Sequence, residues 1–110
     1  MENTSQEKIN FLLKKYPDRI PVIIEKCNFL NLTNNKYLLP KQMYVSYFLS
    51  IIRTKMNKTF DSKKAIFTFV KSGNSYFLIN LNENIENIYN QYKEPDGFLY
   101  IKFGIENTFG

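Results

Sequence analysis

The 110-residue sequence contains no histidine, no tryptophan and a single cysteine, Cys27. The absence of histidine removes the commonest general base and the commonest metal ligand. A lone cysteine excludes an internal disulfide and a cysteine-based zinc site, and without a neighbouring base Cys27 is predicted to be a structural or incidental thiol. The sequence therefore predicts a protein that is not an enzyme, with no catalytic residue, no metal and no cofactor.

Long hydrophobic runs are also missing. The longest nearly apolar stretch, residues 43–52, is interrupted by Ser46 and Ser50 and is about half of the ~20 residues that span a bilayer. The first seven residues are polar and acidic, unlike a signal peptide. The length fits one domain with a core of its own. These features predict a single domain over residues 1–110 in the cytoplasm.

Basic charge is concentrated in one part of the chain. Residues 8–71 contain 13 Lys or Arg and three acidic residues, a local charge of +10, whereas residues 72–110 contain two Lys and five acidic residues, a local charge of −3. A basic body can attract acidic peptides, anionic lipids or nucleic acid, or it can simply be a solvated lysine surface. Nucleic acid is not among the predicted partners, because Lys8, Lys14, Lys15 and Lys36 could instead surround a groove.

The hydrophobic spacing predicts a mixture of helices and strands. In residues 44–56 the apolar side chains Val45, Phe48, Leu49, Ile52 and Met56 recur at helical spacing. The predicted elements, in chain order, are a helix at 7–16, strands at 21–26 and 36–40, the helix at 44–56, a strand at 65–71, an optional return strand at 75–79, a helix at 83–92 and a strand at 98–103.

This order predicts an α+β fold: a four-stranded mixed sheet packed on a central helix, with a short N-terminal helix. The ubiquitin-like β-grasp is the best-known fold of this description. Residues 1–6 are predicted to be a flexible N-terminus and residues 104–110 a flexible C-terminal tail.

Four collinear segments carry a family resemblance. They are residues 14–26 (KKYPDRIPVIIEK), residues 36–40 (KYLLP) with the helix that follows, residues 65–70 (AIFTFV), and residues 96–101 (DGFLYI) with the end ENTFG. Together they resemble the autophagy-related ubiquitin-like modifiers of the GABARAP and microtubule-associated light-chain type. The sequence departs from that family in a short N-terminus, a shorter loop at 27–35, and a longer segment at 72–90 without the family's Pro-Pro-Thr turn.

The resemblance implies lipid conjugation through Gly110. In the family, activating and conjugating enzymes pass the terminal glycine carboxyl group through thioesters to the amine of phosphatidylethanolamine, and a deconjugating cysteine protease acts on the same bond. Glycine suits this chemistry because a residue without Cβ lets an extended tail enter a narrow active site. The location implied is cytoplasmic, and the autophagosome or a related membrane after lipidation.

The resemblance also implies a peptide groove for cargo receptors. Their aromatic-x-x-aliphatic motifs would add a strand beside the second strand of the sheet. An aromatic pocket is implied at Leu12, Pro21, Ile23, Lys36, Leu38 and Phe98, and an aliphatic pocket at Tyr37, Leu39, Pro40, Met43, Phe48 and Ile51.

Asp18 and Arg19 have two readings: they support ligand contacts in the family, or they form a local ion pair worth under ~1 kcal/mol. An adaptor that binds peptides through the same groove without being conjugated is the alternative function.

Overall fold

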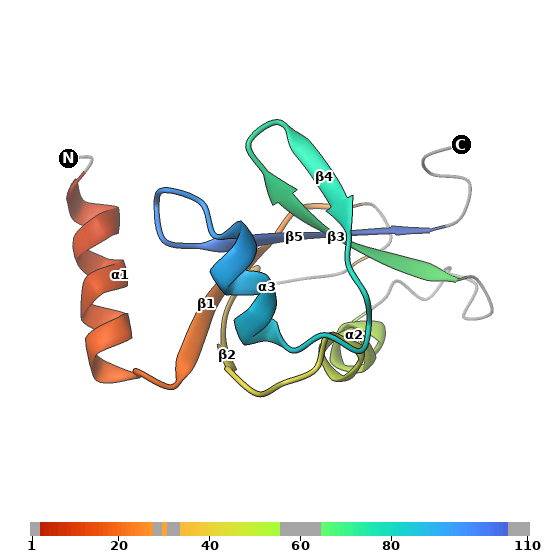
Figure 1. Ribbon diagram of the computed structural model, residues 1–110, viewed down its shortest axis with the longest axis horizontal. Helices are drawn as coiled ribbons and strands as arrows, with labels where there is room; N and C mark the ends of the chain where they lie inside the picture. Colours follow the sequence, from red (N-terminus) through yellow and green to blue (C-terminus); the bar gives the residue numbers. More distant parts are fainter. Residues whose placement is uncertain (1–2, 28–29, 31–33, 56–64, 106–110) are drawn as a thin grey trace.

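The computed structural model describes residues 3–27, 30, 34–55 and 65–105, with only the backbone described at residues 3–6. The elements in chain order are α1 (Asn3–Lys15), β1 (Arg19–Ile24), β2 (Lys36–Pro40), α2 (Val45–Arg53), β3 (Ile66–Ser72), β4 (Ser75–Leu78), α3 (Ile85–Tyr92) and β5 (Leu99–Ile105). Figure 1 shows them in one body. The α+β prediction and the N-terminal helix are confirmed.

The strands form one mixed sheet in the order β2-β1-β5-β3-β4. The central pair, β1 and β5, is parallel, and the remaining neighbours are antiparallel. The described part of the chain therefore forms a five-stranded sheet rather than the predicted four-stranded one. The optional return strand forms as β4, because the turn at Gly73, with φ of 62°, folds it back onto β3.

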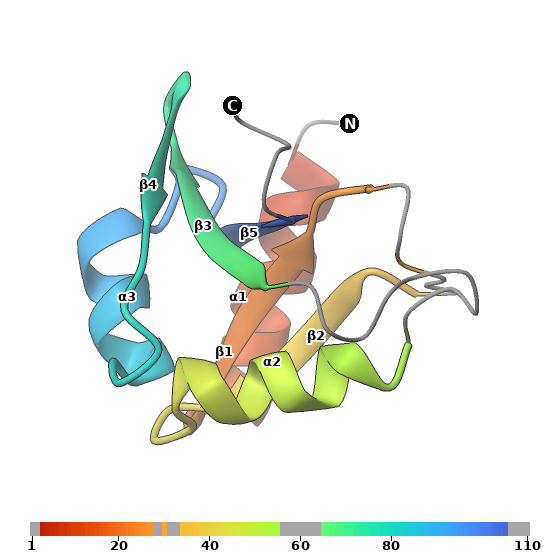
Figure 2. The same cartoon turned by 90° about the vertical axis from the view of Figure 1, so that its right-hand side faces the viewer.

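The core lies between the sheet and α2. Every second residue of β1 and β5 is buried, and so is one face of α2. Figure 2 shows α2 and α3 on one side of β1 and β2, with α1 on the other. The residues that fill this core from β1, β5 and α2 are Ile20, Val22, Ile24, Leu99, Ile101, Phe103, Val45, Phe48, Leu49 and Ile52.

The predicted ends of the domain need correction. Helix α1 begins at Asn3, four residues before the predicted start at residue 7. The periodic pattern missed this turn because the pattern marks only turns that place apolar side chains on a stripe. Strand β5 continues to Ile105, since Gly104 and Ile105 pair with Phe67 and Ile66. Gly104 and Ile105, which were predicted to belong to the tail, are therefore part of the strand, and residues 106–110 lie outside the described residues.

The central helix ends at Arg53 in the structure, and the predicted end at Met56 falls outside the described residues. Within the part of the chain that is described, none of the helices combines the length and the apolar character that crossing a membrane requires.

Candidate functional site

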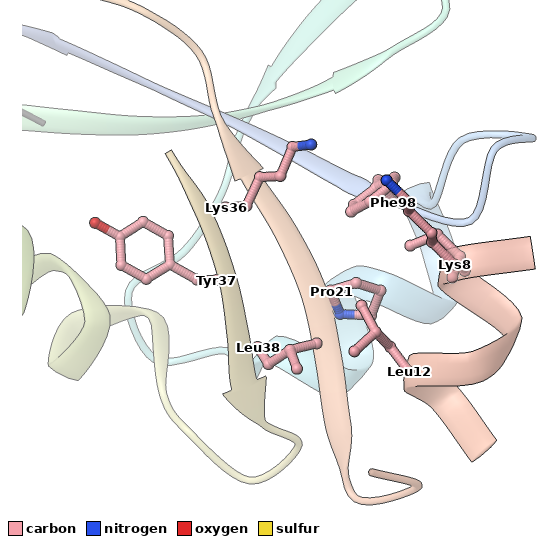
Figure 3. A pocket seen from close by; sticks show the side chains of 8 residues that line it. Lys8, Leu12, Pro21, Lys36, Tyr37, Leu38 and Phe98 are labelled. Atoms are coloured by element: carbon pink, nitrogen blue, oxygen red, sulfur yellow. The ribbon is translucent and has the colours of Figure 1, made fainter. Parts of the chain in front are cut away.

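A cavity of about 470 Å³ lies between α1 and the β1–β2 pair (Figure 3). It brings together Leu12 from α1, Pro21 from β1, and Phe98 from the residue before β5. Lys36 and Leu38 of β2 complete the wall. These residues belong to the set predicted for an aromatic pocket, so segments far apart in the sequence do meet in one apolar hollow.

Ile23, the remaining residue of that set, does not line the cavity. It pairs with Lys36 on the same face of the sheet and is half-buried. Lys8 and Ile9 line the cavity but were not predicted to do so. Lys8 precedes Leu12 by four residues, which places both on one face of α1, and this spacing was the signal available in the sequence.

The pairing of β1 with β2 sorts their side chains to two sides. Leu38 is opposite Pro21, and both point toward α1. Tyr37 and Leu39 alternate with Leu38 and point toward α2, where the rings of Tyr37 and Phe48 meet edge-on with centroids 5.8 Å apart. Tyr37, which we had assigned to the aliphatic pocket, also borders the cavity.

The residues predicted for the aliphatic pocket lie on β2, on α2 and on the loop between them. Leu39 and Phe48 are buried in the core, with exposed fractions of 6% and 0%. Tyr37, Pro40, Met43 and Ile51 are half-buried. The structure thus places Tyr37, Leu39 and Phe48 together on the α2 side of β2, with Leu39 and Phe48 buried, whereas alternation along the strand places Pro40 on the side of Leu38.

Among the described residues, no strand pairs with the outer edge of β2. Ile24 N–H donates to the carbonyl of Asn35 at 2.8 Å, so alternation along the pair turns the main-chain groups of Lys36 and Leu38 away from β1. Side chains occupy two of these outward groups. Lys36 N–H donates to Asn34 Oδ1 at 3.1 Å, and Arg19 Nη1 donates to the Leu38 carbonyl at 3.4 Å.

Arg19 therefore acts at the edge of β2, whereas Asp18 contributes its carbonyl, which accepts from Lys41 N–H at 3.1 Å. The edge can accept another strand once these side-chain contacts give way, because an unpaired row of N–H and C=O groups is a template for pairing. Lys8 and Lys36 are exposed beside the cavity (Figure 3), so its apolar floor has a positive rim.

Gly110, the predicted conjugation residue, lies outside the described residues.

Comparisons with known proteins agree on one family. The family model described as "Autophagy protein Atg8 ubiquitin like" matches residues 4–110. Autophagy-related protein 8h of Arabidopsis thaliana is 41% identical over 104 residues, which cover 92% of this chain and 82% of that protein. Autophagy-related protein 8e of the same plant is 41% identical over 100 residues, which cover 88% of this chain and 77% of the relative.

Two solved structures are similar over most of their length. Trypanosoma brucei ATG8 superposes with a TM-score of 0.74 at 27% identity, covering 100% of this chain and 92% of that one. Plasmodium falciparum Atg8, solved in complex with a Plasmodium falciparum Atg3 peptide, has a TM-score of 0.72 at 28% identity and covers 92% of this chain and 87% of the other.

Proposed function

The chain belongs to the Atg8 family of ubiquitin-like autophagy proteins, and from this premise we propose that Gly110 forms an amide with phosphatidylethanolamine. The observation that carries the proposal is the family match, which extends over residues 4–110 and so includes Gly110.

The proposed chemistry proceeds by acyl transfer. ATP adenylates the Gly110 carboxylate and diphosphate leaves; a cysteine thiolate of the activating enzyme then displaces AMP. The acyl group moves to a cysteine of the conjugating enzyme, and the lipid amine attacks that thioester and releases the thiol. The Plasmodium structure contains an Atg3 peptide, which supports the conjugation machinery as a partner of this chain as well.

The edge of β2 is proposed to bind aromatic-x-x-aliphatic peptides. In an added strand, the aromatic residue at position i and the aliphatic residue at position i+3 point to opposite faces of the sheet. The predicted pockets are arranged in the same way: Leu38 borders the cavity on the α1 side, while Tyr37 and Leu39 point toward α2. The aromatic side chain would enter the cavity, the aliphatic one would lie toward α2, and the main chain would pair with Lys36 and Leu38.

In the cell, the protein is proposed to be cytoplasmic and, when lipidated, to lie on the autophagosome or a related membrane. There it would recruit cargo receptors through the groove, and a cysteine protease would reverse the conjugation.

Conjugation is tested by incubating the protein with the organism's activating and conjugating enzymes, ATP and phosphatidylethanolamine liposomes. We expect a mass increase on the peptide that ends at Gly110, and its loss in Gly110→Ala. No increase in the wild type, with peptide binding intact, would favour the non-conjugated adaptor. The Gly110→Ala variant should bind peptides as the wild type does, because the groove is built from other residues.

The groove is tested by a pair of adjacent substitutions on α1. Leu12→Asp places a charge in the cavity and should weaken binding of an aromatic-x-x-aliphatic peptide by about tenfold or more. Phe11→Asp is the matched control, because Phe11 is 63% exposed and does not line this cavity. Calorimetric titration measures both, and equal effects of the two substitutions would contradict the assigned site.

A further inference from the structure

Strand β4 forms the sheet edge opposite to β2 and presents an uncovered apolar surface. Its three large side chains, Tyr76, Phe77 and Leu78, are 39%, 45% and 63% exposed. Figures 1 and 2 both show the β3–β4 hairpin projecting from the body of the protein. This edge belongs to neither the cavity nor the conjugation site, and it lies in the segment at 72–90 that distinguishes the sequence from the family it resembles.

Strand β4 is short, but it carries none of the side chains that usually protect a sheet edge. Its sequence, SYFL, contains no charged residue, no proline and no glycine. Protective edges carry lysine, proline or a bulge, which prevent another strand from pairing. Two copies of β4 can therefore approach each other without like charges meeting.

The hydrogen bonds within the hairpin determine which main-chain groups are available. Ile79 N–H donates to the Thr68 carbonyl at 3.0 Å, so Ile79 and Phe77 turn their main-chain groups toward β3. Tyr76 and Leu78, which alternate with them, turn theirs toward the open side. The available donors and acceptors on β4 are thus those of two residues that flank Phe77.

The side chain of Tyr76 is held in place across the outer face of the sheet. Its hydroxyl donates to Glu25 Oε1 at 2.6 Å, and Lys102 Nζ lies 4.9 Å from the centroid of its ring. On the other face, the ring of Phe77 stacks on Tyr92 of α3 at 5.6 Å. Because both rings are already ordered, pairing at this edge costs less side-chain entropy than ordering free rings would.

We propose that β4 pairs with β4 of a second copy of the chain, antiparallel and related by a two-fold axis at Phe77. A two-fold axis perpendicular to the sheet leaves the outer faces of both copies on the same side of the joined sheet. The outward main-chain groups of Tyr76 and Leu78 in one copy then lie opposite those of the other copy. In this register Tyr76 faces Leu78 of the second copy and Leu78 faces its Tyr76, and each pair exchanges both N–H···O bonds. Between these two hydrogen-bonded pairs, Phe77 of one copy faces Phe77 of the other.

A second copy fits this edge better than an unspecified peptide, because the edge is complementary to itself. Centring the axis on Phe77 uses both outward residues of β4 and pairs an aromatic with an aliphatic side chain on the outer face. Centring it on Tyr76 would instead place Asn74, in the turn, opposite Leu78. The strand is short, so the dimer is weak and depends on concentration.

Sedimentation velocity of the unconjugated full chain, from about 10 μM to about 1 mM, tests the proposal. We expect a concentration-dependent dimer whose dissociation constant rises by about tenfold or more in Leu78→Pro. Proline at this position removes an outward N–H and leaves the hydrogen bonds to β3 in place. Phe11→Ser is the matched control, because Phe11 has the same exposed fraction, 63%, on another surface; it should dimerise as the wild type does.

Three outcomes would each overturn the proposal. The wild type could stay monomeric at every concentration, Leu78→Pro could dimerise as strongly as the wild type, or β4 could bind foreign strands without self-association. These outcomes leave the proposed function untouched, since no lipid, enzyme or peptide ligand takes part.

Cysteine cross-linking tests the register without relying on a disruptive variant. In a Cys27→Ser background, Phe77→Cys should form an intermolecular disulfide, because a non-hydrogen-bonded pair has Cα atoms about 4.5 Å apart, within disulfide range. Tyr76→Cys is the control and should cross-link more slowly, since it faces Leu78 rather than its own copy. Equal or faster cross-linking at position 76 would contradict the register.

Discussion

Thr68 is a polar side chain buried in the sheet without a hydrogen bond in the described part of the chain. It is 1% exposed, and its Oγ1 has no partner there. Burying an unpaired hydroxyl costs free energy, so Thr68→Val should raise the free energy of unfolding by about 1 kcal/mol. Urea denaturation measures the change. Thr68→Ala is the control and should gain less, because it also leaves a cavity; a less stable Val variant would contradict the prediction.

Tyr100 has a phenol that holds its proton unusually tightly. Burial, followed by a hydrogen bond to Asp96 Oδ2 at 2.5 Å and the charge of that carboxylate, raises the pKa of Tyr100 to about 12. In the unfolded chain the phenol loses its proton near pH 10. The folded state therefore binds more protons between these values, and stability should fall as the pH rises from about 10 to about 12.

Absorbance at 295 nm during an alkaline titration follows the phenolate directly. The transition near pH 12 should disappear in Tyr100→Phe, and it should move to lower pH in Asp96→Asn, which keeps an acceptor but removes the charge. An unchanged transition in Asp96→Asn would show that the charge of Asp96 does not contribute to the raised pKa of Tyr100.

The turn between α3 and β5 passes close to α1 at Gly97. Gly97 has φ of 90°, and a Cβ there would lie 3.1 Å from Ile9 Cγ2. Gly73, in the β3–β4 turn, has φ of 62° and open space around it. Alanine is strained at both positions. Because only Gly97→Ala also displaces Ile9, it should cost about 1 kcal/mol more than Gly73→Ala. Chemical denaturation compares them, and equal costs would show that Ile9 moves freely.

The two edges of the sheet differ in what they expose. The β2 edge lies beside the cavity and is partly occupied by Asn34 and Arg19. The β4 edge is uncharged and has large exposed side chains. This difference is consistent with one edge that exchanges side-chain contacts for a peptide and another that meets its own copy.

At the scale of the whole molecule, the uneven distribution of positive charge should affect how fast charged peptides associate. Residues 8–71 carry a local charge of +10, and two of their lysines, Lys8 and Lys36, border the cavity. A peptide with acidic residues beside its aromatic side chain should therefore associate faster at low salt. Its association rate should fall by about tenfold or more between about 0.01 M and about 1 M salt, because the Debye length shortens from about 30 Å to about 3 Å.

Stopped-flow fluorescence with a labelled peptide measures this rate. The control peptide carries amides in place of the acids and should show a nearly flat salt dependence. A flat response of the acidic peptide would mean that the lysines are a solvated surface without influence on the groove.

The helices, the family and most of the cavity residues could be predicted from the sequence, because short sequence patterns specify them. The stripe from Val45 to Ile52 predicted the central helix, and the four family segments led to the family that the comparisons identify. Resemblance also led to Leu12, Pro21, Lys36, Leu38 and Phe98, which line one cavity.

Other features depended on how distant segments meet, and only the tertiary structure decided them. Ile9 and Lys8 enter the cavity because α1 lies across β1, which periodicity within one helix does not specify. The first turn of α1 is polar, so no apolar stripe marks it in the sequence. The end of β5 is set by the pairing of Gly104 and Ile105 with Phe67 and Ile66 of β3. Helical stripes and turns follow from neighbouring residues, whereas an edge, a cavity or a pairing partner exists only after the chain has packed against itself.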